Sequence, residues 1–154
     1  MVLALDGSWP VAEPSLRQAH HTLTVGTEGR GLLDLTALLA RWLADVRAQE
    51  GLCTLFLQHT SASLLVQENA DPQVQADLER FFARLVKDGD PLFRHDAEGP
   101  DDMPAHVRAA LTSTQLSVPV RRGRLALGTW QGVYLYEHRL EGHSRSLALH
   151  YLGT

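Results

Sequence analysis

Two histidines and several carboxylates gather in one polar segment, residues 94–106, and could together hold a metal ion. His95 lies near its start, His106 ends it, and Asp102 precedes His106 by four residues. If the intervening turn is helical, Asp102 and His106 share one face of it. Imidazoles with nearby carboxylates suit zinc or a similar divalent metal, with the carboxylates as ligands or as groups that orient the imidazoles. Alternatively, Asp101 or Asp102 only caps the helix that follows.

A polar turn between two apolar segments is a candidate anion site. It contains His59, Thr60, Ser61 and Ser63, and so combines an imidazole, three hydroxyls and free backbone N–H groups. Such a turn can cradle a phosphate-like anion, which makes Thr60 and Ser61 candidate anion ligands. The alternative is an ordinary hairpin turn rich in serine and threonine, with no ligand.

A third polar group consists of Glu137, His138 and Arg145. If residues 133–139 and 145–151 pair as a hairpin, the period of two places Glu137 and Arg145 on one face and His138 on the other. Glu137 and His138 then enter one pocket only if a β-bulge or a second subunit intervenes. Glu137 and Arg145 form either a structural ion pair or an anion site in which the carboxylate orients the arginine.

Hydrophobic periodicity predicts the elements that position these groups. Apolar residues recur at helical spacing over residues 35–46 and 74–85, and Pro104 begins a short helix that reaches about Leu111. Asp71 suits the cap of the second helix, with proline in its first turn. Apolar or alternating segments predict strands at residues 18–25, 52–58, 61–67, 115–119, 125–129, 133–139 and 145–152.

This order of elements favours an α+β fold. Strands do not alternate regularly with helices, so a largely antiparallel sheet flanked by two to three helices is expected rather than a doubly wound one. A chain of 154 residues suits one domain, which we assign to residues 18–154, after an irregular N-terminal arm at residues 1–17. The polar loop at residues 87–103 is long, and long loops are often functional.

Composition argues against several classes of protein. Lys and Arg total 14 against 18 Asp and Glu, and the net charge of −4 argues against general nucleic-acid binding. The apolar runs are too short to cross a membrane, and the N-terminus lacks the basic region of a signal peptide, so we expect a cytoplasmic protein. Cys53 is the sole cysteine, which excludes an intrachain disulfide; its apolar strand predicts a buried core residue.

The order of the motifs along the chain resembles one known family. The motifs are HTSAS at residues 59–63, ENADP at 68–72, DLER at 77–80, EGPDDMPAH at 98–106, GTWQG at 128–132, EH at 137–138 and SR at 144–145. Together they resemble the YjbQ-like proteins, some of which carry the name secondary thiamine-phosphate synthase. The resemblance runs from about Gln18 to Gly153. Each motif alone is weak, but their joint occurrence is highly specific.

The resemblance implies a compact α+β fold with a β-sandwich-like sheet, assembled as a homotrimer with pockets near the subunit interfaces. The arm before Gln18 is longer than the resemblance requires. On this basis the predicted metal ligands are His95, His106 and His138. The predicted catalytic residues are His59, Asp102, Glu137 and Arg145, and the predicted anion ligands are Thr60, Ser61 and Arg145.

If the family name applies, the reaction joins a pyrimidine methyl diphosphate to a thiazole phosphate and expels diphosphate. That chemistry needs a divalent cation at the leaving group and donors for the phosphate oxygens. Imidazole ligands suit zinc better than magnesium, which prefers oxygen. Zinc-assisted hydrolysis of a small phosphorylated substrate, with Glu137 or Asp102 as base, is therefore an alternative. A non-enzymatic module that binds a phosphorylated metabolite is another, so the sequence leaves open whether the chain is an enzyme.

Overall fold

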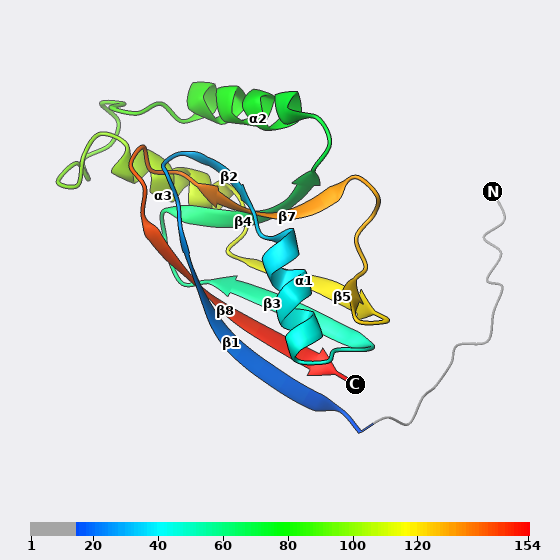
Figure 1. The fold of residues 1–154 in the computed structure, drawn as a ribbon. Helices are drawn as coiled ribbons and strands as arrows, with labels where there is room; N and C mark the ends of the chain where they lie inside the picture. The colour runs from blue at the N-terminus through cyan, green and yellow to red at the C-terminus, as the bar shows by residue number, and fades with distance from the viewer. Residues whose placement is uncertain (1–14) are drawn as a thin grey trace, which may run out of the picture.

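Two antiparallel β-sheets and three helices make up residues 15–154, the part of the chain that the computed structural model describes (Figure 1). The elements are β1 (Arg17–Gly26), β2 (Gly31–Asp34), α1 (Thr36–Asp45), β3 (Gly51–Leu57), β4 (Ala62–Glu68), α2 (Pro72–Leu85), α3 (Asp102–Leu111), β5 (Gln115–Arg121), β6 (Arg124–Leu125), β7 (Gln131–Glu137) and β8 (Ser144–Gly153). The predicted α+β class with antiparallel sheets is confirmed.

The two sheets share one hydrophobic core. The larger sheet has the strand order β1-β8-β3-β5-β6 and the smaller one β2-β7-β4. Leu55 of β3 and Leu147 of β8 meet Leu64 of β4 and Leu135 of β7 in this core, and each is at most 1% exposed. Burying a leucine of this kind stabilises the fold by roughly 1.5–3 kcal/mol. The core therefore fixes the strand ends that carry the polar groups.

The predicted hairpin between residues 133–139 and 145–151 is wrong. β7 pairs with β2 and β4 in the smaller sheet, whereas β8 pairs with β1 and β3 in the larger one. Both are central strands with each edge occupied, and the connection at residues 138–143 carries the chain from one sheet to the other. Glu137 and Arg145 still meet, but across the space between the sheets.

Two predicted boundaries need correction at turns. The strand predicted at residues 125–129 is β6, which ends at Leu125. The residues after it lead into a turn in which the N–H of Gln131 donates to the carbonyl of Gly128 at 3.0 Å. α3 begins at Asp102 rather than at Pro104. A proline is tolerated there because the N–H groups of the first helical turn have no partner within the helix.

Helix α2 covers the smaller sheet only loosely. Asp71 caps it as predicted, since its Oδ1 accepts from the N–H of Gln73 at 2.9 Å. The predicted apolar stripe is only partly covered, because Phe81 is 49% and Leu85 56% exposed. Phe82 meets the ring of Tyr136 edge-on, with centroids 5.7 Å apart. In Figure 1 α2 lies beyond the smaller sheet, on the side away from the larger one.

The first strand begins at Arg17, the last residue of the predicted arm. Residues 1–14 of that arm lie outside the described part of the chain, and their irregular conformation stays a prediction. Cys53 is fully buried in β3, as predicted. Over residues 15–154 no helix is both long and apolar enough to cross a membrane.

Candidate functional site

His95, Asp102 and His106 come together at the start of α3, and we call them the histidine–aspartate cluster. Nε2 of His95 lies 2.9 Å and Nε2 of His106 lies 3.4 Å from Oδ2 of Asp102. One nitrogen or oxygen from each residue lies within 4.8 Å of the other two. Oδ2 of Asp102 is buried and, despite its short distance to His95, has no partner in hydrogen-bonding geometry. A buried carboxylate oxygen that faces two ring nitrogens is an arrangement that a cation would satisfy.

Neighbouring groups orient the members of this cluster. Nδ1 of His106 lies 2.9 Å from the carbonyl oxygen of Thr60, which can only accept a hydrogen bond. Nδ1 must therefore carry a proton, so that in the neutral ring Nε2 has the lone pair that a metal ligand needs. Nη1 of Arg139 donates to Oδ1 of Asp102 at 2.6 Å, which leaves Oδ2 directed at the histidines.

Arg139 joins the polar loop to the end of β7, and no role was predicted for it from the sequence. Its Nε donates to Asp101 at 3.0 Å and its Nη2 to the carbonyl of Glu98 at 2.7 Å. Burial alone would raise the pKa of Asp101, but hydrogen bonds from the N–H of Leu140 and from Arg139 outweigh it and lower that pKa. Its position directly after Glu137 and His138 is the sole sequence signal for this arginine.

The polar turn after β3 connects the two sheets and is no hairpin, because β3 and β4 belong to different sheets. His59 accepts a hydrogen bond at Nε2 from the N–H of Ser146, 2.8 Å away. Burial and the nearby Arg145 lower the pKa of His59, which favours the neutral ring. Because Nε2 accepts a hydrogen bond, the proton of that ring lies on Nδ1. The carbonyl of Thr60 holds His106, which joins the turn to the histidine–aspartate cluster.

Glu137 and Arg145 form a buried, two-pronged ion pair. Nε of Arg145 donates to one oxygen of Glu137 at 2.7 Å and Nη2 to the other at 2.5 Å. Thr27 and the N–H groups of His138 and Arg139 also donate to this carboxylate. Burial alone would raise the pKa of Glu137, but these hydrogen bonds, led by Arg145, lower it. The predicted catalytic role of both residues stays a prediction, and their contacts favour the structural alternative.

His138 lies apart from the histidine–aspartate cluster, on the opposite side of β7 from Glu137. It is fully buried, its Nε2 lies 2.9 Å from the hydroxyl oxygen of Ser63, and its ring contacts that of Tyr136. Burial, and then the positive charge of Arg108, lower the pKa of His138 to about 3. The structure therefore groups Asp102, rather than His138, with His95 and His106.

The depressed pKa of His138 predicts a pH-dependent stability. The unfolded chain protonates this residue below about pH 6.5, whereas the folded chain does so at about pH 3. The contribution of His138 to stability is therefore fully present above about pH 6.5. It falls as the pH drops, by at most about 1.4 kcal/mol per pH unit. In urea unfolding between about pH 4 and 7, His138→Gln should flatten the pH dependence by about one proton. Replacing the exposed His21 by Gln should leave it unchanged, and equal slopes for wild type and His138→Gln would contradict the expectation.

Comparisons with known proteins agree on one family. A family model described as "UPF0047 protein YjbQ-like" matches residues 21–154. "UPF0047 protein sll1880" from Synechocystis sp. is 47% identical over 139 residues, which cover 90% of this chain and 95% of that protein. "UPF0047 protein YjbQ" from Escherichia coli O157:H7 is 48% identical over 127 residues, covering 82% of this chain and 91% of that protein.

The fold also matches solved structures. The crystal structure of hypothetical protein APE1520 from Aeropyrum pernix K1 has a TM-score of 0.79 and 33% identity, and the match covers 88% of this chain and 99% of that one. The names of these relatives identify a family and a fold without stating a reaction.

Proposed function

Because this chain belongs to the YjbQ-like UPF0047 family, we propose that it is a metal-dependent enzyme that acts on a small phosphorylated substrate. The observation that carries this proposal is the convergence of two imidazole nitrogens and one buried, unpartnered carboxylate oxygen at the start of α3. His95, Asp102 and His106 would hold the ion. Two nitrogen ligands and one oxygen ligand suit zinc or a similar metal better than magnesium. A bound ion of this kind would neutralise charge on a phosphate leaving group.

The residues around the cluster offer donors for phosphate oxygens. Thr60 and Ser61 belong to the turn whose carbonyl holds His106. Their hydroxyls form no hydrogen bond with any other residue between 15 and 154. Arg94 precedes His95, is exposed and forms no ion pair in that range. Their uncommitted hydroxyl and guanidinium donors make these three residues the proposed anion contacts.

The contacts of Glu137 and Asp102, the two candidate bases, favour transfer over hydrolysis. Hydrolysis needs a general base, but Glu137 accepts hydrogen bonds from four residues, and Asp102 is the proposed carboxylate ligand of the ion. In the thiamine-phosphate synthase reaction, a carbon–oxygen bond to diphosphate breaks and a carbon–nitrogen bond to the thiazole forms. That step depends on stabilising the leaving diphosphate more than on removing a proton. We therefore propose the transfer as the reaction and zinc-assisted hydrolysis as the alternative.

One experiment separates these readings. Zinc-loaded protein is incubated with a pyrimidine methyl diphosphate and a thiazole phosphate, together and singly, and then with a panel of phosphomonoesters. Diphosphate release that requires both substrates supports the transfer, whereas inorganic phosphate from the panel supports hydrolysis. Binding without turnover identifies a non-enzymatic module. Zinc-independent behaviour throughout would contradict the metal-dependent proposal.

We also propose a homotrimer, which the resemblance implies. An exposed apolar patch on the outer face of the larger sheet supports association, because Leu52 and its cross-strand partner Leu152 are 40% and 44% exposed. Phe56 lies four residues further along β3, on the same face as Leu52, and is 49% exposed. Light scattering behind a sizing column should give three times 17.0 kDa, and Phe56→Glu should shift the protein toward monomer. A wild-type monomer at micromolar concentration would refute the trimer.

A further inference from the structure

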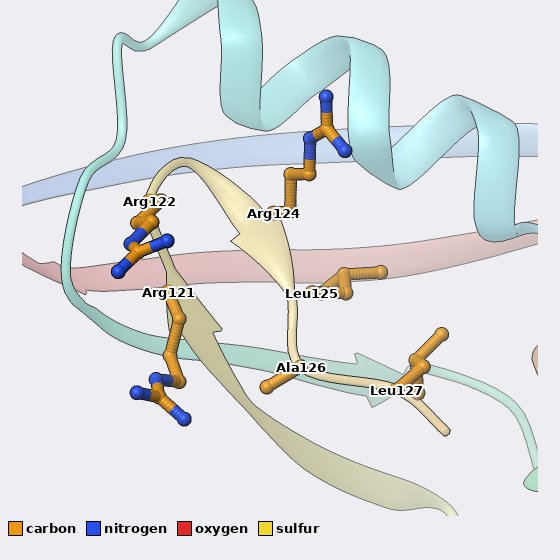
Figure 2. Close-up of a pocket in the computed structure, with 6 residues that line it drawn as sticks. All are labelled: Arg121, Arg122, Arg124, Leu125, Ala126 and Leu127. Atoms are coloured by element: carbon orange, nitrogen blue, oxygen red, sulfur yellow. The ribbon is translucent and has the colours of Figure 1, made fainter. Parts of the chain in front are cut away.

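We propose a second ligand site, for a small anion that carries several negative charges, at the hairpin between β5 and β6. Arg121, Arg122 and Arg124 fall within four residues there, and all three are exposed. They line a pocket of about 450 Å³. Figure 2 draws the residues that line it. The rest of its lining is apolar: Leu125, Ala126 and Leu127.

No carboxylate between residues 15 and 154 forms an ion pair with these guanidinium groups. Glu50 lies beside the hairpin, but its carboxylate accepts from the backbone N–H of Arg122, at 2.8 Å. Arg121 and Arg124 are direct partners across the two strands, and like charges placed opposite each other lower stability. Their side chains extend away from each other in Figure 2. A multiply charged anion would relieve this repulsion.

Arg122 occupies a backbone conformation that an arginine rarely adopts. Its φ is 50° and that of Gly123 is 74°. Two successive positive values are the pattern of a type I′ turn, in which Asn-Gly is the favoured pair. A long, charged side chain at a position better suited to asparagine or glycine is an unfavourable choice for folding alone. The outlier therefore points to a role for the guanidinium group.

Residues outside the hairpin hold the backbone of its tip in place. The N–H of Gly123 donates to the carbonyl of Gln49 at 2.9 Å, and the N–H of Arg122 donates to Glu50. An anion that binds here needs to order only arginine side chains, because the backbone that carries them is already fixed. Preorganisation of this kind strengthens binding.

The number of arginines indicates the class of anion. Nucleic-acid binding proteins typically neutralise about 6–10 phosphates, far more than three guanidinium groups can contact. Arginine forks bind phosphate oxygens in pairs, so a diphosphate or triphosphate matches three arginines better. Arg121 lies beyond the Gly51 end of β3, whereas His59 lies beyond its other end. A seven-residue strand separates the hairpin from the histidine–aspartate cluster by on the order of 20 Å.

Calorimetry on metal-free, EDTA-treated protein tests this site independently of the proposed metal site. Inorganic phosphate, diphosphate and triphosphate should bind with affinity that rises in that order. Arg121→Gln/Arg124→Gln should weaken diphosphate binding at least roughly tenfold, since charge-assisted contacts are lost. The matched control is Arg80→Gln/Arg84→Gln, which removes the same charge from α2 and should leave the affinity unchanged.

A second variant separates binding from folding. Arg122→Gly removes one guanidinium group but suits the positive φ, so its melting temperature should equal or exceed that of wild type. Its affinity for diphosphate should nevertheless fall. The proposal is overturned if diphosphate and triphosphate bind more weakly than about 1 mM. It is also overturned if the Arg121/Arg124 variant binds diphosphate like wild type, or if a single-stranded oligonucleotide outcompetes triphosphate.

Discussion

Asp102→Asn is expected to remove zinc binding almost completely. The substitution replaces the buried Oδ2, the one carboxylate oxygen within reach of both His95 and His106. Loss of a group that only orients a ligand costs 10–100-fold in metal affinity, so the loss of a ligand itself should exceed about 100-fold. Competition with a chromophoric chelator measures the affinity, and elemental analysis of protein purified without a metal-affinity tag measures the content.

The design of this variant guards against simple unfolding. An asparagine keeps an oxygen that can accept the hydrogen bond from Arg139 at the Oδ1 position. The matched control is Asp96→Asn, which removes the same charge from an exposed position in the same loop and should keep zinc. His138→Gln distinguishes the ligand set predicted from sequence from the cluster at α3, because it should also keep zinc. Retention of wild-type affinity by Asp102→Asn would refute the cluster as a metal site.

The alternation along β7 could be predicted from the sequence because it is a local property of a strand. Val133 and Leu135 enter the core, whereas Tyr136 and His138 face the other way, as the period of two requires. The partners of the strand could not be predicted in this way. Hydrogen bonds between strands join segments that are distant in the chain, and the alternation of residues 133–139 does not specify which strands they pair with.

The same distinction explains which parts of the candidate site were found. Asp102 and His106 lie four residues apart on one helix, so their proximity follows from helical geometry. His95 joins them through the path of a loop. Its place in the same polar segment made it a candidate ligand, but no periodicity predicts that it contacts Asp102. Arg139 was missed because its contacts to Asp101 and Asp102 join residues 38 and 37 positions apart, respectively. No local pattern marks such a contact.

Arg145→Ala is expected to destabilise the fold strongly and to change ligand affinity little. The arginine is 3% exposed, and two of its nitrogens bind both oxygens of Glu137. Removing one partner of a buried ion pair leaves an unpaired charge and costs about 3–5 kcal/mol. For a chain of this size that corresponds to a melting temperature lower by roughly 10 °C. Urea unfolding measures the stability, and titration of the folded fraction with a thiazole phosphate measures the affinity.

The opposite outcome, near-normal stability with at least tenfold weaker thiazole phosphate binding, would assign Arg145 to the anion site instead. A double variant sharpens the distinction, because Glu137→Gln/Arg145→Met removes both charges and should recover much of the lost stability.

The pH dependence of the stability gives an independent check on the role of Arg145. In the wild type, the pKa of Glu137 is lowered, so the pair stabilises the fold above the ordinary glutamate pKa and this contribution disappears as the pH falls through the folded pKa. In Arg145→Ala, the unpaired carboxylate is destabilising when charged and is relieved by protonation. The difference in unfolding free energy between wild type and Arg145→Ala should therefore shrink in acid, and a difference that stays constant with pH would mean that the ion pair is not its source.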